Sequence, residues 1–357
     1  MEEWKEYRLG EVVNILDYKR IPLSSAERKT REGGFPYYGA QGIIDYIDDY
    51  IFDGTYLLIA EDGENLKSKK QDIAQLAHGK YWVNNHAHIV ESNGICDIRY
   101  LCYILNNIDL SGYITGSAQP KLNQANLSAI SIILPSLNLQ EQIADFISMF
   151  DNKIELNRRI NDNLEQQAQA LFNEMFPHVT EGENMIGDLI MPKRGKGLLS
   201  KNAIKGDIPV VAGGIEPATY HNQANTTAPV LTIAASGANA GYINLWHIPV
   251  WASDSSYIDD SITPNVYFWY IMLKKRQKEI FDAQVGSAQP HIYPKHIAEL
   301  PMNVVFVEKI AEYNEIVTSI FEKKGQLFLE SKRLTSLRDT LLPKLMSGEL
   351  KINDINN

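Results

Sequence analysis

Apolar residues recur at helical spacing along one long segment of the chain, residues 141–176. From Ile143, alternating steps of four and three residues pass through mostly apolar positions, which is the a/d pattern of a coiled-coil seam. The seam includes Ile143, Ile147, Phe150, Ile154, Asn157, Asn161, Leu164 and Leu171. No Gly or Pro interrupts the segment, so we predict one helix of roughly 54 Å at 1.5 Å per residue. Asn138, followed by Glu141, is expected to cap its start, and Pro177 follows its end.

A second long helix is predicted over residues 308–342, with Pro343 directly after it. Its seam is less regular, because Lys324, Ser331 and Arg338 occupy seam positions. The apolar members are Tyr313, Val317, Ile320, Leu327, Leu334 and Leu341. Each helix follows a globular segment, so an antiparallel pair is the simplest way to bury both stripes. Two interpretations of Asn157 and Asn161 stay open: a solvated stretch of the seam, or a buried polar lock on its register.

The chain repeats itself. The pentapeptide Gly-Ser-Ala-Gln-Pro at 116–120 recurs unchanged at 286–290. Flanking sequence repeats in the same order, because the apolar run 57–60 matches 231–234, and Tyr103 matches Tyr270. An identical pentapeptide with matching surroundings on both sides is not expected by chance. We therefore infer that one large module is present twice.

Each copy predicts the same order of elements. Short β-rich runs come first, followed by an apolar helix, the Gly-Ser-Ala-Gln-Pro turn, a short strand and a long helix. The runs lie at 55–60 and 230–235, the apolar helices at 98–105 and 266–280, and the short strand of the first copy at 130–134. The expected fold is α+β. It comprises two globular domains, 1–137 and 179–306, and two antiparallel coiled-coil segments, 138–178 and 307–357, the second with a C-terminal tail.

Charge limits the nucleic-acid contacts that are possible. With 34 Lys and Arg against 44 Asp and Glu, the formal net charge is −10, which argues against non-specific coating of nucleic acid. Any contact must come from local basic clusters, each of which is either a phosphate-binding patch or plain solvated surface. The candidates are Arg28, Lys29, Arg31, Lys67, Lys69, Lys70, Lys193, Arg194, Lys196, Lys201 and Lys205. Another cluster, residues 274–278, suits the solvated C-terminal end of an apolar helix.

No residue pattern predicts catalysis. The chain has no P-loop, no dinucleotide-binding glycine motif, no nucleophile elbow and no glycine motif for S-adenosylmethionine. His86 and His88 lack a partner at metal-binding spacing, so we interpret them as alternating strand residues and expect no metal. Cys96 and Cys102 are expected in the core, without a disulfide framework. The sequence also lacks a signal peptide and a membrane span, so we expect a soluble, cytoplasmic protein.

Four motifs occur in a fixed order along the chain. The Gly-Ser-Ala-Gln-Pro turn is followed by residues 134–137 (LPSL) and 140–143 (QEQI), and residues 341–350 read LLPKLMSGEL. In this order, and across nearly the whole chain, they resemble the conserved regions of specificity subunits of type I restriction–modification enzymes. The second copy departs from the family pattern, because residues 304–310 (VVFVEKI) stand where the first copy has its Gln-Glu-Gln segment.

The resemblance implies a DNA sequence-recognition subunit whose two target-recognition domains each read one half of a bipartite double-stranded target with unlike halves. It implies no catalytic activity and no cofactor on this chain. Two modification subunits would methylate adenine with S-adenosylmethionine, and restriction subunits would use ATP and Mg²⁺. The long helices would then set the gap between the half-sites. The alternative is a coiled-coil adaptor that bridges proteins without reading bases.

The Gly-Ser-Ala-Gln-Pro turns have two interpretations in this setting. In the first, they are structural loops in which Gly supplies a special backbone angle. In the second, their polar side chains contact the DNA backbone. Those side chains are Ser117, Gln119, Ser287 and Gln289.

Overall fold

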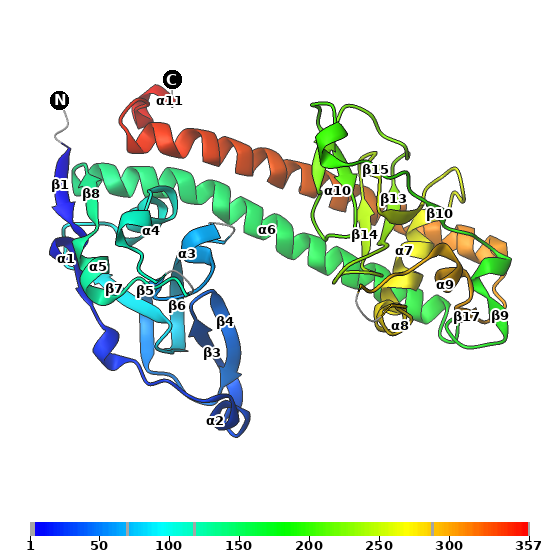
Figure 1. Ribbon diagram of the computed structural model, residues 1–357, viewed down its shortest axis with the longest axis horizontal. Coiled ribbons are helices and arrows are strands. Elements are labelled where there is room, and N and C mark those ends of the chain that lie inside the picture. The colour runs from blue at the N-terminus through cyan, green and yellow to red at the C-terminus, as the bar shows by residue number, and fades with distance from the viewer. Residues whose placement is uncertain (1–3, 69–70, 117–118, 287–288, 356–357) are drawn as a thin grey trace. The chain divides into compact units, whose positions relative to one another are not determined.

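The computed structural model describes residues 4–68, 71–116, 119–286 and 289–355. The chain divides into two compact units, whose helices and strands are labelled in Figure 1. Unit 1 combines Met1–Asn152 with Leu334–Asn357, and unit 2 is Lys153–Arg333.

Unit 1 is built on a six-stranded sheet in the order β2-β7-β5-β6-β3-β4, with β1 and β8 as a separate pair. β3 and β6 are parallel, and the other neighbours are antiparallel. The strands are β1 (Lys5–Arg8), β2 (Val13–Ile15), β3 (Glu32–Gly39), β4 (Gly42–Ile47), β5 (Phe52–Ala60), β6 (Ala74–Val83), β7 (Ala87–Ser92) and β8 (Ser131–Leu134). The helices, with 3-10 helices marked η, are α1 (Leu9–Val12), η1 (Asp17–Lys19), α2 (Ser25–Lys29), α3 (Asn65–Ser68), α4 (Ile98–Asn107), η2 (Ser111–Tyr113), α5 (Gln124–Ala129) and α11 (Ile352–Ile355).

Unit 2 has a four-stranded sheet in the order β10-β16-β13-β14, a three-stranded sheet β12-β11-β15, and the pair β17-β9. The strands are β9 (Asn184–Met185), β10 (Lys193–Arg194), β11 (Ile208–Val211), β12 (Thr219–His221), β13 (Val230–Ala234), β14 (Ile243–Trp246), β15 (Trp251–Ala252), β16 (Ser255–Ile258) and β17 (Pro301–Met302). The helices are η3 (Ile186–Asp188), η4 (Ser200–Asn202), α7 (Val266–Lys275), α8 (Gln277–Asp282) and α9 (Pro294–Ala298).

The two units share one topology, which confirms the repeat. β5 lies between β7 and β6 as β13 lies between β16 and β14, and β2 and β10 take the same outer place. The parallel pair β3·β6 is matched by β11·β15, and β1·β8 is matched by β9·β17. In unit 2 the counterpart of β6 is divided into β14 and β15 by residues 247–250, where Pro249 cannot donate a ladder hydrogen bond. The α+β fold with two pseudo-repeated domains is therefore confirmed.

A close backbone contact repeats with the topology. A Cβ placed on Gly10 lies 3.0 Å from Ser128 Cβ, and one placed on Gly187 lies 3.0 Å from Ala298 Cβ. Gly10 lies in α1 and Gly187 in η3, and both pack against the short helix that follows the Gly-Ser-Ala-Gln-Pro turn. Glycine in each copy allows this contact, because the Cβ of any other residue would press against the neighbouring Cβ.

The core of each unit follows from local sequence. In β5, Leu57 and Ile59 belong to one buried cluster and Leu58 to another, so this central strand is buried on both faces. Asp97 caps α4, because its carboxylate accepts backbone N–H bonds from the first turn. In unit 2, α7 is buried along residues 266–273. This stretch is apolar all round, which is typical of a fully buried helix.

Both predicted long helices are present. α6 spans Leu137–Met175 and α10 spans Val307–Met346, and each has residues in both units. The cap predicted at Asn138 is wrong, because the Ser136 carbonyl and hydroxyl accept the Leu139 N–H at 3.0 and 3.4 Å. The predicted end at residue 342 is also wrong, because α10 continues through Pro343. Leu345 is buried in the core of unit 1, and this packing holds the last turn despite the hydrogen bond that Pro343 removes.

The predicted seam is buried to different degrees. The buried members include Ile143, Ile147, Asn157, Tyr313, Val317 and Leu327. The partly buried members are Phe150, Ile154, Asn161, Leu164, Leu171, Ile320, Leu334 and Leu341. Phe321, which the seam omitted, is completely buried against Tyr267 at a ring-centroid distance of 4.6 Å. In the second helix, Phe321 is therefore buried in the core in place of the neighbouring Ile320, which is partly exposed.

Asn157 distinguishes between the two interpretations of the polar seam. Its side chain is 0% exposed. Its Nδ2 donates to Glu330 Oε2 at 2.9 Å and to Ser331 Oγ at 3.3 Å, both on α10 within unit 2. A buried amide with partners on the facing helix supports the register lock. Asn161 is partly exposed.

In unit 2 a buried ion pair joins the module to both long helices. Tyr270 of α7 donates to Glu165 Oε1 of α6 at 2.8 Å, and Lys324 of α10 pairs with the same carboxylate. Burial raises the pKa of Glu165, but the Lys324 charge and the hydrogen bonds outweigh it and leave the pKa below its ordinary value. Lys324 is only 9% exposed, so this seam position is polar because it is paired.

Unit 1 contains the same arrangement with different residues. Tyr103 of α4 donates to Asp151 Oδ2 of α6 at 2.5 Å, and Arg338 Nη1 of α10 contacts Asp151 Oδ1 at 2.7 Å. Tyr103 and Tyr270 are matched residues of the repeat. Each module is thus fixed to the long helices by a tyrosine, an acid of α6 and a base of α10.

Three further predictions have clear outcomes. The helix predicted over 266–280 is divided at Arg276 into α7 and α8. Arg276 is 2% exposed and bonds to Glu279 and to the Pro301 carbonyl, so the prediction of a solvated basic end is wrong there. Cys96 and Cys102 are free cysteines, buried and partly buried. Within the described ranges, no helix has the length and apolarity needed to cross a bilayer.

Candidate nucleic-acid interface

In each unit the Gly-Ser-Ala-Gln-Pro turn lies beside the loop that leaves the central strand. In unit 1, Thr115 and Lys121 exchange two backbone hydrogen bonds of 2.8 Å, and Leu122 N donates to Glu61 O at 2.8 Å. In unit 2, Val285 and His291 make the matching pair, and Ile292 N donates to Ala235 O at 2.9 Å. The repeated motif therefore has one structural place, at the end of β5 or β13.

The glycine of the turn has a defined role. Gly116 has φ +82° and Gly286 has φ +97°, a backbone conformation that side chains rarely adopt. A Cβ on either residue would lie within 2.6 Å of the carbonyl oxygen of Gln119 or Gln289. This geometry confirms the special backbone angle. Ser117 and Ser287 lie outside the described residues, and Gln119 and Gln289 are exposed, so their contact with DNA stays a prediction.

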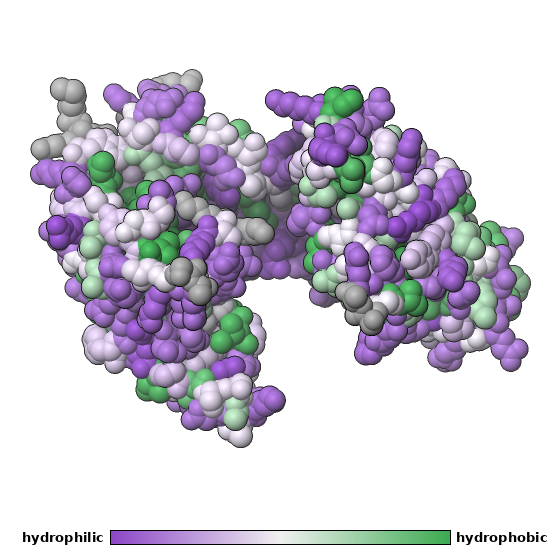
Figure 2. All heavy atoms as spheres, viewed as in Figure 1, coloured by the Kyte–Doolittle hydropathy of each residue, from purple (hydrophilic) through white to green (hydrophobic). Residues whose placement is uncertain are grey.

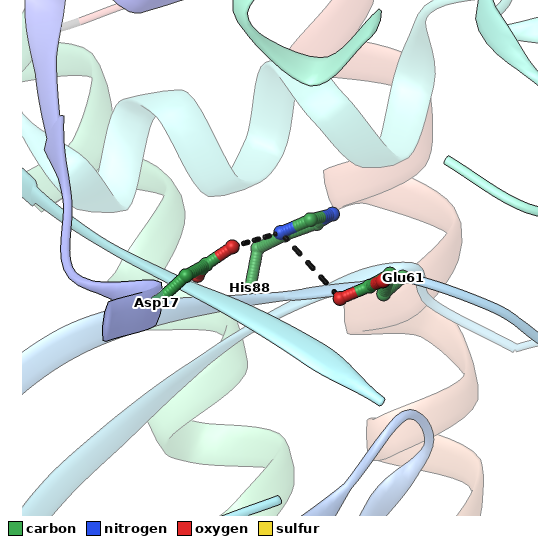
Figure 3. Close-up of side chains that lie close together, drawn as sticks. All are labelled: Asp17, Glu61 and His88. Atoms are coloured by element: carbon green, nitrogen blue, oxygen red, sulfur yellow. Dashed lines mark hydrogen bonds and ion pairs between the residues drawn. The ribbon is translucent and has the colours of Figure 1, made fainter. Parts of the chain in front are cut away.

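A buried charged cluster anchors this loop in unit 1. His88 Nδ1 lies 2.6 Å from Asp17 Oδ2 and 3.9 Å from Glu61 Oε2, as Figure 3 shows. His88 Nε2 lies 2.7 Å from the Leu122 carbonyl oxygen, just after the turn. Both ring nitrogens therefore lie within hydrogen-bonding distance of an oxygen atom. The cluster was missed because no motif links three residues so far apart in sequence.

The same three side chains are those that a metal ion would use. They are a histidine and two carboxylates whose donor atoms lie within 4.8 Å of one another. Arg20 lies across them, with Nη1 2.7 Å from Glu61 Oε2 and Nη2 3.2 Å from Asp17 Oδ2. Burial raises the pKa of Glu61, but Arg20, His88 and Lys121 together lower it below its ordinary value. The carboxylates are thus neutralised by the protein's own cations, and the geometry is that of an ion network.

Polar side chains reach solvent around this network. His86 Nδ1 contacts Asp62 Oδ2 at 2.7 Å, and the histidine side chain is 49% exposed. Tyr18 is 78% exposed, with Lys19 over its ring at 5.7 Å. These residues come from η1, the end of β5 and the start of β7. They form a mixed polar and aromatic surface beside the turn.

The strand registers define equivalent positions in unit 2. Ala60 pairs with Ala87 in unit 1, and Ala234 pairs with Ser255 in unit 2. The residues just before β7 and β16, His86 and Asp254, therefore correspond. Figure 1 labels β5, β7 and β13.

The equivalent positions carry different chemistry. In place of the Asp62–His86 pair, Ser236 donates to Asp254, and Arg194 Nη2 contacts Asp254 Oδ1 at 2.5 Å. Arg194 of β10 pairs with Ser256 of β16. In unit 1, Leu16 N donates to Ile89 O and extends the β2·β7 ladder, which places Asp17 opposite His88. At these strand ends unit 1 thus presents the imidazole of His86, whereas unit 2 presents the guanidinium of Arg194.

The basic clusters of unit 2 remain candidates for phosphate contacts. Lys196, Lys201 and Lys205 are exposed, and the described part of the chain offers none of them a carboxylate partner. Lys193 Nζ bonds to Ser261 Oγ at 3.0 Å. Charged side chains in this loop are therefore available to solvent and anions.

In unit 1 both predicted arginines have structural partners. Arg28 pairs with Asp45 and lies over the Tyr37 ring, and Arg31 pairs with Asp48 and lies over the Trp82 ring. Lys29 is exposed. Lys67 is in α3, and Lys69 and Lys70 lie outside the described residues. In that first cluster, tertiary pairing fixes both arginines to the surface of the module.

The edge strand of unit 1 is apolar on its outer side. Ile43 and Ile44 of β4 are 44% and 51% exposed. Figure 2 shows hydrophobic residues among the polar ones in the part of unit 1 that β3 and β4 occupy in Figure 1. This surface differs in character from the polar loops beside the turn.

Comparisons with known proteins show which family the chain resembles. A family model described as type I restriction modification DNA specificity domain matches residues 1–166. A putative type I restriction enzyme specificity subunit from Haemophilus influenzae is 33% identical over 217 residues, which cover 58% of this chain and 55% of that protein. A type I restriction enzyme specificity subunit from Methanocaldococcus jannaschii is 23% identical, covering 99% of this chain and 98% of that protein. In these matches the chain is similar to type I restriction enzyme specificity subunits.

A solved structure shares the fold of this chain. The crystal structure of a type I restriction–modification S subunit from Mycoplasma genitalium superimposes with a TM-score of 0.62 at 21% identity. The alignment covers 96% of each chain. The match with the Haemophilus influenzae relative spans about half of that protein's length.

The polar residues at the strand ends were not predicted from the sequence. Asp62 and Ser236 each stand two residues after a matched apolar run. Their shared position after the run was the signal in the sequence that could have identified both residues. Asp254 gave no such signal, because its position depends on the register between β13 and β16.

Proposed function

We propose that this chain is the DNA sequence-recognition subunit of a type I restriction–modification complex. Each unit reads one half of a bipartite double-stranded target, and the two halves differ in sequence. One observation carries the proposal: a single topology occurs twice with different polar side chains at equivalent strand ends, Asp62–His86 in one unit and Ser236–Asp254–Arg194 in the other. Two domains that share a scaffold but present different hydrogen-bond donors and acceptors select different bases.

The partners follow from the family. The chain works in the cytoplasm with two modification subunits that use S-adenosylmethionine, and with restriction subunits that use ATP and Mg²⁺. It supplies no catalytic group or cofactor itself. The exposed lysines of residues 196–205 fix the duplex through phosphates, and strand-end side chains read base edges.

Methylome sequencing tests this proposal. The chain and its modification subunit are expressed together in a host without adenine methylation, and methylated positions are mapped. We expect one bipartite motif with two unlike halves and a fixed spacer, and none when this chain is omitted. Active methyltransferase with no dependence on this chain, or methylation without a bipartite motif, would support the adaptor and contradict sequence recognition.

A further inference from the structure

Arg194 is held in a fixed position at the strand end of unit 2. Its Nη2 donates to Asp254 Oδ1 at 2.5 Å, and the other oxygen of that carboxylate accepts the Ser236 hydroxyl. Asp254 is therefore bonded on both oxygens. A guanidinium bonded to an oriented carboxylate loses much of its rotational freedom before any ligand arrives.

The backbone under Arg194 is fixed as well. Gly195 N donates to Ser255 O at 2.8 Å, and Lys196 N donates to Ala252 O at 2.9 Å. A Cβ on Gly195 would lie 2.5 Å from the Ala252 carbonyl oxygen, so the glycine allows this segment to lie directly on the strand ends. The Trp251 Nε1 bond to Lys196 O, 2.8 Å long, adds a further constraint.

Arg194 also keeps donors free for a ligand. Its side chain is 40% exposed and that of Asp254 is 38% exposed. Arginine carries five N–H donors. Among the described residues of unit 2, Asp254 is the one acceptor that bonds the guanidinium. Arg194 is exposed in the same segment as the exposed Lys196 and Lys201.

The matched position in unit 1 is used differently. Asp17 is 7% exposed and turns inward to His88 and to Ile89 N, which it accepts at 3.0 Å. A buried carboxylate there reads no base. The exposed arginine is thus a property of one unit, which suits a residue that sets sequence preference and not one that all modules need for folding.

We propose that Arg194 reads a guanine in the half-site of unit 2, positioned by Asp254 and Ser236; this rests on the proposed function. Guanine is the base that presents two acceptors, O6 and N7, to a bidentate guanidinium in the major groove, and this is the commonest specific contact between proteins and DNA. Lys201 serves as a phosphate contact of the same loop and carries no base preference.

Competition binding with the assembled complex of this chain and its modification subunits tests the inference. A labelled duplex with the methylated motif is displaced by duplexes altered at each base pair. For the Arg194→Ala complex, discrimination at one G·C pair of the unit 2 half-site should fall by about 5-fold to 150-fold. Every position of the other half-site should keep its discrimination, which serves as an internal control for folding.

Two further variants separate reading from general binding. Asp254→Asn should lower discrimination at the same base pair by a smaller factor, because the guanidinium loses its charged anchor. Lys201→Ala should weaken binding to all duplexes equally and reduce the salt dependence. Unchanged discrimination at every position in both Arg194→Ala and Arg194→Gln would overturn the inference. Absence of any bipartite motif for the wild-type complex would overturn the proposed function instead.

Discussion

Gly325 lets α10 lie close to the connection between β14 and β15. It is inside the helix, and its φ is not in the left-handed region, so backbone conformation does not require a glycine there. A Cβ on Gly325 would lie 2.8 Å from His247 Cγ and 2.9 Å from both His247 Cβ and Nδ1. We predict that Gly325→Ala destabilises unit 2, although the same change stabilises most helices.

Two opposing effects set the size of the change. Alanine is more favourable than glycine in a helix interior by about 1 kcal/mol. Overpacking a closely packed contact costs about 1–3 kcal/mol. Rotation of the imidazole does not relieve the clash, because His247 Cβ is one of the three close atoms and moves only with the backbone. We therefore expect a net loss of about 1 kcal/mol in the free energy of unfolding of unit 2.

Urea unfolding followed by hydrogen exchange in peptides of β14 and α7 measures this loss within unit 2. The background His247→Gly removes all three close atoms, so Gly325→Ala should become stabilising there by about 1 kcal/mol. Ser319→Ala, at an exposed position of the same helix, is the matched control and should change stability by a few tenths of that amount. Equal stabilisation by Gly325→Ala in the presence and absence of His247 would refute the steric argument.

Three other predictions follow from the structure. Burial and then the charge of Lys324 lower the pKa of His247 from 6.5 to about 4. The unfolded chain therefore gains a proton that the folded chain does not, and unit 2 should lose up to about 3 kcal/mol as pH falls from 6.5 to 4. His247→Gln should flatten this part of a urea-midpoint against pH plot, and an unchanged slope would contradict the assignment. Asn157→Leu should keep or raise the melting temperature while broadening spin-label distances between α6 and α10 within unit 2; a single narrow distance would count against the register lock. Gln119→Ala with Gln289→Ala should lower DNA affinity without changing the melting temperature if the turns contact the DNA backbone, and unchanged affinity would leave them a structural role only.

The repeat and the long helices were predictable from sequence because they depend on local rules. An identical pentapeptide marks equivalent places whatever the fold. A seam such as Ile143 and Ile147 follows from helical periodicity, which is a property of neighbouring residues. Local rules also failed at the ends, where the buried Leu345 carries α10 past Pro343.

The candidate site was less predictable. Arg28 and Arg194 look alike in sequence, as basic residues in loop-like segments. Strand register decides that Arg28 lies over Tyr37 beside Asp45, whereas Arg194 is presented to solvent by Asp254. Partners far apart in sequence cannot be paired by composition or spacing.

The sequence by itself determined that one module occurs twice and that each copy leads into a long helix. Each of these rests on repetition or periodicity along the chain. Only the tertiary structure decided which charged groups are neutralised inside the fold, such as Asp17 with Arg20, and which keep donors exposed at the surface. The physical reason is that hydrogen bonds between distant residues depend on backbone positions that are set by the packing of the whole module.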